Sequence, residues 1–439
     1  MVTAFFRILL YAVIIILPVI LVTVLIDSTD PFLYELGRNT ALAGFMILIC
    51  QVVLAGRFKW IERAFGLDIL LRFHKHMAVA AAGLLLLHPL ILSAGRGDMH
   101  LLIPLAHPWF ITLGRVALAL ILINVVVSMF RARLNLKFET WRLAHDIFGP
   151  IIVLFAFIHS ILVGHDLQQP FMRTLWFILL IASLLLFTWH RIIRPWRLKQ
   201  HPWRVIDVQP ESSNVWTVKL APPEGGRVFD YLPGQFQFIT FYRDRNLPVE
   251  EHHWTISSSP TEKNYVSSTI KALGDFTSTI KDTRPGDTAS VHAPFGRFSY
   301  VLNPPETNMV FVAGGIGITP LMSMLRHMRD TGDTRSVTLF YGNPNTDQIV
   351  FQREISEMEA GGKPALKVIH VLSAPDENWH GERGHINVDM IMKYTGQDLA
   401  RKLFFICGPL PLINGITAGL MEKGVPHRQI RIEIFTLVD

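Results

Sequence analysis

Cysteine is scarce in this sequence of 439 residues, and its two examples, Cys50 and Cys407, stand far apart. The chain therefore has no C-x-x-C-H segment for covalent attachment of a c-type haem. It also lacks a cysteine cluster for an iron–sulfur centre and a D-x-D-x-D-G loop for calcium. Any metal-containing group would have to be held by other side chains.

Charged residues are also few: they make up 17% of the chain, whereas about a quarter is typical of soluble domains. The shortage lies in the first half, where apolar stretches run over 4–26, 39–56, 73–93, 108–130, 145–164 and 174–190. These lengths suit a hydrocarbon core of about 30 Å, so we expect six transmembrane helices. The first is expected to be retained, because it is long and lacks the small-residue cleavage site of a signal peptide.

The few charges of the first half are unevenly distributed between its loops. Basic residues follow the second, fourth and sixth stretches, at Arg57, Lys59, Arg63, Arg131, Arg133, Lys137, Arg191, Arg194, Arg197 and Lys199. The alternate loops carry Asp27, Asp30, Glu35, Asp98 and Asp166. By the positive-inside rule both termini are expected in the cytoplasm. This topology explains most of the net charge of +6, and no separate basic patch indicates nucleic acid.

Four histidines, His74, His88, His145 and His159, fall as two pairs on the third and fifth apolar stretches, fourteen residues apart in each. On an α-helix this spacing is nearly four turns, or about 21 Å along one face. Both stretches run in the same direction, so His74 should face His145 and His88 should face His159. We predict that the first pair binds the iron of an inner b-type haem, and the second pair that of an outer one.

The alternative is that these histidines are ordinary buried side chains satisfied by their neighbours. Ionisable groups at hydrocarbon depth are costly and usually functional, and four in matched spacing favour the ligand interpretation. His76 lies about 200° round the helix from His74 and is expected at the membrane interface. A channel or transporter with a redox-sensing domain is a remote alternative, because mid-span polar residues other than the histidines are few, mainly Gln51 and Asn124.

Several polar residues are expected near the outer side. Arg38 and Arg115 either snorkel to the interface or contact the outer haem propionates or an anionic acceptor. Three more histidines, His100, His107 and His165, lie in or beside outer loops. There they either bind a metal acceptor or are scattered surface residues.

The second half of the chain shows a different pattern, with short alternating stretches separated by proline and glycine. Strands are expected at Val215–Leu220, Gln235–Phe241, Tyr265–Lys271 and Thr288–His292, which is typical of an antiparallel β-barrel. Later strands, at Met309–Ala313, Val337–Tyr341, Leu366–Val371 and Leu403–Ile406, alternate with helical stretches and indicate an α/β sheet. We therefore expect three domains: an all-α six-helix bundle (1–200), a β-barrel (201–302) and an α/β domain (303–439).

Three segments of this half carry groups suited to nucleotides. In the segment 251–260 the aromatic Trp254 stands next to hydroxyl-bearing residues, and in 271–278 a glycine and hydroxyls free backbone N–H groups for phosphate oxygens. The glycine-rich segment 312–320 follows a strand and opens a helix at Leu321, an arrangement that favours a pyrophosphate. Taken alone, the first two segments are also compatible with a strand end and a turn, and Cys407 with a buried structural cysteine.

The six apolar stretches, with H-x13-H on the third and fifth, resemble the ferric-reductase transmembrane domain shared by NADPH oxidases and metalloreductases. The second half is similar to the ferredoxin-NADP reductase module that this family carries. The likeness extends over nearly the whole chain. It implies an FAD- and NAD(P)H-dependent membrane flavocytochrome with two b-type haems.

The resemblance also implies site residues, motif by motif. The family's H-P-F-T motif matches 252–255, with His253 in place of proline and Trp254 in place of phenylalanine, and implies flavin contacts at His252, Trp254 and Thr255. Further implied cofactor contacts are Ser257, Ser258, Gly274, Phe276, Thr277, Gly315, Gly317, Thr319, Pro320, Cys407, Gly408 and Pro409. Thr255, Cys407 and Phe435 are implied in catalysis, Phe435 as the aromatic residue that covers the flavin.

These parts predict a sequence of electron carriers. NAD(P)H gives two electrons as a hydride and a haem accepts one, so a flavin is needed between them. We expect electron transfer from cytoplasmic NAD(P)H through FAD and two haems to an extracytoplasmic acceptor. Dioxygen, giving superoxide, is the favoured acceptor. Ferric or cupric ion and a periplasmic protein are the alternatives, because a bis-histidine haem leaves no open iron position to distinguish them.

Two further expectations concern the choice between NADH and NADPH and the membrane in which the protein resides. The segment 341–347 lacks Arg and Lys and carries Asp347, which suits a free ribose hydroxyl and leans to NADH, against the family expectation of NADPH. Arg326 or Arg353 is the alternative source of charge for a 2′-phosphate. The resemblance implies a bacterial inner membrane, with membrane lipid as surroundings and no evident protein partner.

Overall fold

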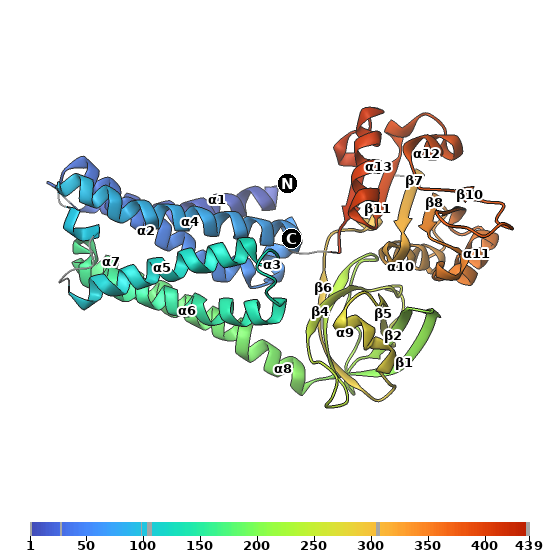
Figure 1. Cartoon of the computed structure of the whole chain (residues 1–439), viewed down its shortest axis with the longest axis horizontal. Helices are drawn as coiled ribbons and strands as arrows, with labels where there is room; N and C mark the ends of the chain where they lie inside the picture. Colours follow the sequence, from blue (N-terminus) through green and yellow to red (C-terminus); the bar gives the residue numbers. More distant parts are fainter. Residues whose placement is uncertain (1, 27–28, 98, 103–107, 304–307, 436–439) are drawn as a thin grey trace. The chain divides into compact units, whose positions relative to one another are not determined.

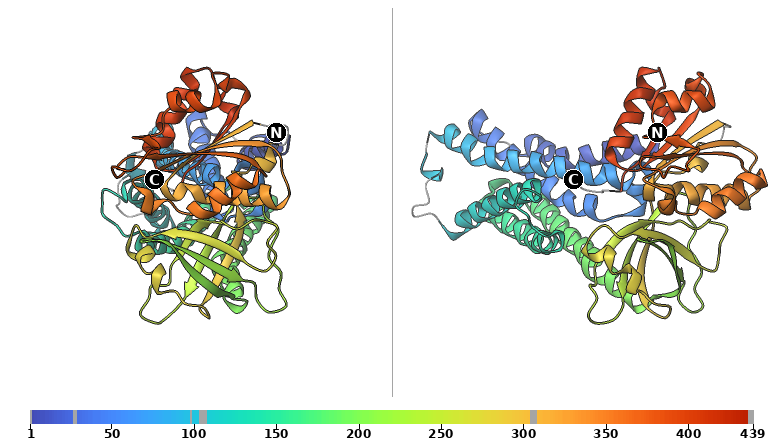
Figure 2. Two further views of the ribbon diagram at one scale, coloured as in Figure 1. Left: turned by 90° about the vertical axis from the view of Figure 1, so that its right-hand side faces the viewer. Right: turned by 45° about the vertical axis from the view of Figure 1, so that its right-hand side comes forward.

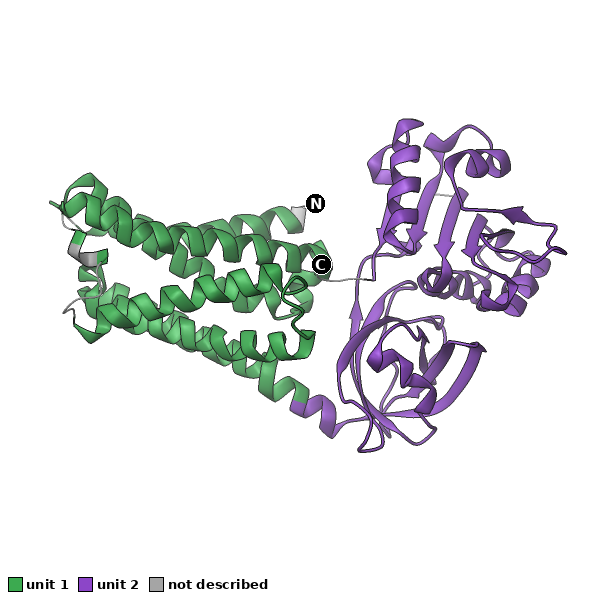
Figure 3. Ribbon diagram, viewed as in Figure 1, with its two compact units in different colours: residues 1–195, 438 green, residues 196–437, 439 purple. Residues whose placement is uncertain are grey.

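A computed structural model describes residues 2–26, 29–97, 99–102, 108–303 and 308–435 of the chain. The chain splits after Pro195 into two compact units (Figure 3). The first unit is entirely helical in the described residues, and the second holds two β-sheets. The predicted limits of the three domains stay a prediction.

Long apolar helices make up the first unit (Figure 1). They are α1 (Val2–Leu25), α2 (Phe32–Ala55), α4 (Leu67–Arg96), α5 (Trp109–Phe130), α6 (Phe138–Val163) and α7 (Pro170–Thr188), with the short α3 (Lys59–Phe65) between α2 and α4. Within the described part of the chain, six helices are long and apolar enough to cross a membrane. The prediction of six spans in an integral membrane protein is confirmed.

The helices of the first unit pack through a core of large side chains. Phe45 and Trp176 stack with ring centroids 5.4 Å apart, and Val22 and Phe157 belong to the same buried cluster. Many other apolar side chains of these helices are exposed, as expected for surfaces that face hydrocarbon. The fold therefore uses its interior for packing and for the few polar groups described below.

The last span does not end as a regular α-helix. After α7 the chain passes through a π-helical turn at Trp189–Ile193 and continues as α8 (Arg194–Gln200). Arg191 in this turn forms an ion pair with Asp146 of α6, and Arg194 donates to the carbonyl oxygen of Gly56 at 3.3 Å. These contacts fix the turn against the helices of its own unit.

An antiparallel sheet forms the first part of the second unit, as predicted. Its strands are β1 (Trp203–Ser212), β2 (Val215–Ala221), β3 (Phe236–Tyr242), β4 (Glu251–Thr255), β5 (Val266–Lys271) and β6 (Thr288–Phe295), in the order β4-β3-β6-β1-β2-β5. The sheet curls (Figure 2), and just beyond β4 the Ser257 N–H donates to the Ser267 carbonyl on β5 at 2.8 Å. The two edge strands thus approach one another without a continuous ladder, so the sheet is barrel-like but not a closed barrel.

A parallel sheet forms the rest of the unit. Its strands are β7 (Asn308–Gly314), β8 (Ser336–Asn343), β9 (Ala365–Leu372), β10 (Glu382–Arg383), β11 (Leu403–Cys407) and β12 (Ile430–Glu433), in the order β10-β9-β8-β7-β11-β12. One core cluster joins the sheet to α10 (Ile318–Asp330) and α11 (Gln352–Gly361), and a second joins it to α12 (Val388–Thr395) and α13 (Leu410–Glu422). The strand order reverses between β7 and β11, which is where open α/β sheets bind ligands.

Candidate functional site

The structure brings the predicted inner histidine pair together. His74 on α4 and His145 on α6 have ring centroids 6.1 Å apart, with their planes at 68°. Imidazole nitrogens bind transition metals at about 2.0 Å, so one metal ion fits between two rings at this separation. In the outer pair, His88 and His159 lie close enough to interact electrostatically.

Three of the four histidines are oriented by a hydrogen bond from Nδ1 to an oxygen on a neighbouring helix. His88 donates to the Gly37 carbonyl at 2.8 Å and His159 to the Phe110 carbonyl at 2.9 Å. A carbonyl only accepts, so the proton sits on Nδ1 and the Nε2 lone pair is left for a metal. This is the arrangement expected of metal-binding histidines, and the residues present fit haem ligation.

A polar network supports the inner pair in the same way. His145 Nδ1 lies 3.0 Å from the Asn124 side-chain oxygen on α5. Ser128 donates to the Asn124 carbonyl at 2.6 Å and accepts a 3.1 Å hydrogen bond from the Trp141 indole. His74 Nδ1 has no hydrogen-bond partner within the described ranges. The sequence showed Asn124 only as a polar residue in mid-span, and nothing in it named His145 as the partner.

Two glycines leave room beside the histidines. A Cβ atom on Gly114 of α5 would lie 2.5 Å from His159 Nδ1, so only glycine allows that ring its place. Gly149, one turn beyond His145, would carry a Cβ with no heavy atom within 4 Å. The first glycine therefore sets the ring position, and the second marks open space on the histidine side of α6.

At the outer end, Arg38 is engaged in a buried ion pair with Asp166. Its Nε lies 3.0 Å from Oδ2 and its Nη1 lies 3.1 Å from Oδ1. The Asp166 side chain is only 4% exposed, and burial raises its pKa against the opposing effect of Arg38. The charge of Arg38 is thus balanced within the protein, and a contact with an acceptor or haem stays a prediction, as it does for the half-buried Arg115.

Of the three outer-loop histidines, only His165 has a described side chain. His165 is exposed, while His107 lies outside the described residues, as do Asp27 and Asp98. Where the chain is described, no group of three or more His, Cys, Asp or Glu residues is arranged to hold a metal ion.

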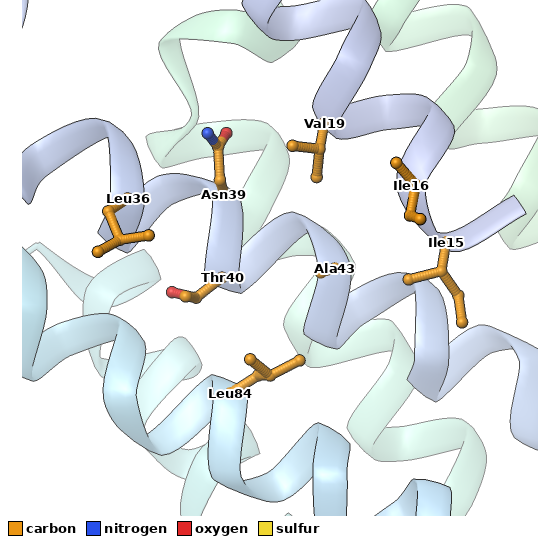
Figure 4. A pocket seen from close by; sticks show the side chains of 8 residues that line it. All are labelled: Ile15, Ile16, Val19, Leu36, Asn39, Thr40, Ala43 and Leu84. Carbon is orange, nitrogen blue, oxygen red and sulfur yellow. The ribbon is translucent and has the colours of Figure 1, made fainter. Parts of the chain in front are cut away.

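An apolar groove of about 290 Å³ lies between α1, α2 and α4 (Figure 4). Ile15, Leu36 and Leu84 line it, together with Thr40. The Thr40 hydroxyl donates at 2.7 Å to the Gly37 carbonyl, the group that also accepts from His88. None of the predicted site residues lines this groove.

In the second unit, three predicted flavin residues form one aromatic cluster. The His252 ring lies 4.2 Å from the Phe276 ring and 5.4 Å from the Trp254 ring, centroid to centroid. His252 and Trp254 share a face of β4, and Phe276 comes from the short helix α9 (Asp275–Ser278). The Thr277 hydroxyl accepts from the Leu273 and Gly274 N–H groups at 2.9 Å and so shapes the turn before α9.

Two of the predicted flavin residues, Ser257 and Ser258, have hydroxyls that are hydrogen-bonded within the sheet. The Ser257 hydroxyl lies 3.0 Å from the hydroxyls of Ser267 and Thr269, and the Ser258 hydroxyl lies 3.0 Å from that of Tyr231. Both serines are at most 4% exposed. Their hydroxyls thus have partners within the sheet, and a contact of these two residues with a flavin stays a prediction. Thr255, at the end of β4, is itself buried.

His253 lies on the opposite face of β4 from His252 and holds the end of the chain. Its Nε2 donates to the Phe435 carbonyl at 2.7 Å. Phe435 also packs against the core cluster around β7 and α10. The proline that the family has at this position carries no donor, so the contact depends on the histidine of this chain.

The nucleotide loop and the Cys407 loop meet at the reversal point of the parallel sheet. Gly315 has φ +53°, and a Cβ on Gly317 would lie 2.3 Å from the Cys407 carbonyl oxygen. A Cβ on Gly314 would lie 2.8 Å from Pro409 Cδ. Glycine is therefore required for the close backbone approach between the ends of β7 and β11.

The predicted residues on either side of this junction are mostly enclosed. The helix begins at Ile318, three residues earlier than predicted, and Thr319 and Pro320 are buried in its first turn. Cys407 is completely buried in the core, and burial raises the pKa of its thiol. Its side chain therefore serves as packing in this structure, and a place beside the nicotinamide stays a prediction. Gly408 follows it at the junction.

Arg326 and Arg353, the alternative sources of charge for a 2′-phosphate, both form ion pairs within the protein. Arg326 binds both carboxylate oxygens of Glu354, at 3.0 and 2.6 Å, and donates to the Ser257 carbonyl at 2.6 Å. Arg353 is exposed and paired with Glu357 at 2.7 Å. Both guanidiniums already have carboxylate partners, so neither is set aside for a phosphate.

The Arg326 ion pair makes stability depend on pH. Burial alone would raise the pKa of Glu354, but Arg326 and Arg329 outweigh it and hold this pKa below the usual glutamate value. The stabilisation is thus fully present above the usual glutamate pKa and is lost as pH falls through the lower folded-state value. We expect the protection factors of the α10 amides, taken against the intrinsic exchange rate at each pH, to fall as pH is lowered in the native chain and to change less with pH in Glu354→Gln.

Glu357→Gln is the matched control, because Glu357 lies on α11 like Glu354 but is exposed and pairs only with Arg353 in the described contacts. Its α10 amides should follow the native pH dependence. Identical pH profiles for Glu354→Gln and the native chain would show that this carboxylate does not stabilise the junction.

Comparisons with known families cover all three parts of the chain. Residues 40–156 match the ferric reductase like transmembrane component, residues 200–291 an FAD-binding domain, and residues 311–418 the oxidoreductase NAD-binding domain. The matches follow one another along the chain in the predicted order.

Curated relatives share about half of this chain. The reductase component of propane 2-monooxygenase from Rhodococcus jostii is 30% identical over 242 residues, which is 53% of this chain and 63% of that protein. Flavohemoprotein A from Dictyostelium discoideum is 30% identical over 241 residues, 51% of this chain and 57% of that protein. The chain thus spans less than two thirds of the length of these relatives.

Among solved structures, the FAD/NAD-binding domain of a nitric oxide dioxygenase from Vibrio cholerae is 21% identical, with a TM-score of 0.48 over 53% of this chain and 98% of that one. A TM-score below 0.5 carries no argument about function. The family matches confirm the predicted architecture: a segment that matches the ferric reductase like transmembrane component is followed along the chain by an FAD-binding domain and an NAD-binding domain.

Proposed function

We propose that this protein transfers electrons across a membrane, from NADH through FAD and two b-type haems to dioxygen. The observation that carries the proposal is the orientation of the four histidines. Three of them hold their proton on Nδ1 through a bond to a neighbouring helix, and the inner rings stand 6.1 Å apart. Buried imidazoles fixed in this way are prepared to ligate metal through Nε2.

His74 and His145 would hold the inner haem, and His88 and His159 the outer one. The flavin supplies the conversion of a two-electron hydride into single electrons, and the haems supply single-electron steps at two depths of the membrane. The protein residues fix the imidazole orientation, since the Nδ1 bonds prevent the rings from turning. The apolar helices around them keep water away from the histidines.

The flavin and nucleotide sites follow from the second unit. The rings of His252, Trp254 and Phe276 would offer a stacking surface for the flavin, with Thr255 at the strand end and Phe435 held nearby by His253. The turn at Gly274 and Thr277 would contact its phosphates. The loop at Gly315–Pro320 and the segment Cys407–Pro409 would hold the nicotinamide nucleotide at the reversal point of the sheet.

Charge supports an orientation with both termini in the cytoplasm, because basic residues follow the second, fourth and sixth spans. The nucleotide would then bind inside and the acceptor outside. NADH is proposed over NADPH because Arg326 and Arg353 are both paired with glutamates. A bacterial inner membrane is proposed from the family resemblance.

Dioxygen is proposed as the acceptor on the ground of its own chemistry, since bis-histidine ligation would suit any acceptor that takes an electron without binding iron. Dioxygen is small and apolar, and it reaches the outer end through hydrocarbon without a polar binding site. Reduction of ferric or cupric ion, or of an outer protein, would use the same electron path and is an alternative outcome of the test.

The test is stopped-flow spectroscopy on purified protein that has been reduced with NADH under anaerobic conditions and is then mixed with air-saturated buffer. Rapid haem reoxidation with superoxide, trapped and sensitive to dismutase, is the expected result. Reduced haems that persist in air and discharge on adding a ferric chelate would replace dioxygen by metal ion. A protein without a haem band would contradict the proposal at its first step.

Replacement of Gly114 by alanine should remove one haem and leave the other. The added methyl would collide with His159 and displace its ring, whereas His74 and His145 are untouched. We expect haem content to fall from about two to about one per chain, because loss of ligand geometry costs at least 10- to 100-fold in metal affinity. Haem is counted by pyridine extraction against protein concentration.

Gly83→Ala is the matched control, since a Cβ at Gly83 of α4 would meet nothing within 4 Å. It should keep both haems. Equal haem contents in the two variants would mean that Gly114 does not hold His159 in a ligand position.

Replacement of Gly317 by alanine should weaken nucleotide binding and spare the flavin. The new methyl would lie 2.3 Å from the Cys407 carbonyl and force the two loops apart. We expect a rise of about tenfold or more in the apparent dissociation constant for NADH, measured by titration of flavin reduction. Gly361→Ala, whose Cβ has open space on α11, should bind NADH like the native chain.

A further inference from the structure

The helix α10 is fastened to the segment that follows the flavin strand β4. Arg326 Nη1 donates to the Ser257 carbonyl at 2.6 Å, and Ser323 Oγ donates to the Ser258 carbonyl at 2.7 Å. We call these two contacts the α10 clamp. Both acceptors are backbone groups, so the clamp holds the course of the main chain itself.

A third bond extends the attachment by one more turn of the helix. Asp330 Oδ2 accepts from the Thr261 hydroxyl at 2.7 Å. Ser323, Arg326 and Asp330 lie three and four residues apart and therefore share one face of α10. Three side chains of this face thus bind residues 257–261.

Arg326 is itself held in one position. Glu354 of α11 binds its guanidinium through two oxygens, at 3.0 and 2.6 Å, and the Phe351 ring lies 4.7 Å below its carbon atom. The arginine side chain is 15% exposed. A planar fork fixed by a bidentate carboxylate and an aromatic face has little freedom, so the bond to Ser257 has a fixed direction.

The α10 clamp joins the end of the flavin strand β4 to the helix that follows the nucleotide loop, and the proposed reaction needs these two parts at a fixed distance and angle. Ser257 lies two residues beyond Thr255, the end of the flavin strand, and α10 begins at Ile318 directly after the nucleotide loop. Arg326 stands eight residues along that helix, about 12 Å from its start. A rigid helix therefore transmits the position of the flavin strand to the nucleotide loop.

We propose that Arg326 is a positioning residue for hydride transfer, because it fixes the nucleotide loop relative to the flavin strand. This inference rests on the proposed function of the second unit. Arg326 contacts neither cofactor in this scheme, and it sets the distance and angle between them. Loss of the clamp should therefore slow the hydride step more than it weakens nucleotide binding.

The experiment compares Arg326→Ala with Arg353→Ala in the full-length, flavin-loaded protein. Arg353 is the matched control, because it lies on the neighbouring helix in an exposed pair with Glu357. Anaerobic stopped-flow with increasing NADH gives the limiting rate of flavin reduction and the dissociation constant separately. The long-wavelength charge-transfer absorbance between nicotinamide and flavin reports their stacking.

For Arg326→Ala we expect the limiting rate to fall about 10- to 100-fold, since misplacement of reacting atoms by about 1 Å has effects of this size. The charge-transfer band should weaken, and the dissociation constant should change less than about threefold. Arg353→Ala should match the native chain in all three. A raised dissociation constant with an unchanged limiting rate would overturn the proposal and make Arg326 a nucleotide-binding residue.

Two further variants, Ser323→Ala and Glu354→Gln, test the α10 clamp if Arg326→Ala does not fold. Each leaves the arginine in place and loosens one side of the clamp, so each should lower the limiting rate by a smaller factor. Unchanged rates in both would overturn the proposal. A native protein whose flavin NADH does not reduce would instead contradict the proposed function, whatever the variants do.

Discussion

The membrane half depends on the cost of placing an imidazole in hydrocarbon. Such a ring needs polar partners, and for His88 and His159 the fold supplies one from the backbone of a neighbouring helix. The Gly37 and Phe110 carbonyls belong to α2 and α5, so these helices and the histidine-bearing α4 and α6 must keep their relative rotation. The packing of α2, α4, α5 and α6 therefore determines the direction in which the Nε2 lone pairs of His88 and His159 point.

The soluble half meets a different constraint, which is the close approach of main chains. The ends of β7 and β11 touch at Gly317, where no side chain fits, and α10 grips the backbone carbonyls of Ser257 and Ser258. Backbone contacts of this kind cannot adapt by changing rotamer. The glycine loop at 315–317 and the end of β4 are therefore held rigidly relative to one another, although Ser257 and Gly317 are 60 positions apart in the sequence.

Spacing was enough to find the histidines and the glycine loop, because both follow from the period of a single helix or turn. Their partners could not be found in this way. Carbonyl acceptors carry no residue signature, and the ion pair of Arg326 with Glu354 depends on how α10 and α11 lie on the sheet. The hydroxyl partners of Ser257 and Ser258 could not be found either, because a motif gives residue type but not the direction in which a hydroxyl points beyond a strand end.

The π-helical turn at Trp189–Ile193 sets the rotation about the helix axis of the helical residues that directly follow it. A π turn holds one residue more than an α turn, so α8 is rotated by about 100° from the continuation that an unbroken α-helix would give. The ion pair of Arg191 with Asp146 holds that extra residue on the helix bundle. The number of residues in this turn therefore decides which face of the last span Arg194 occupies, and inserting or deleting one residue in the turn would rotate that side chain by about 100° while lengthening or shortening the helix by only about 1.5 Å.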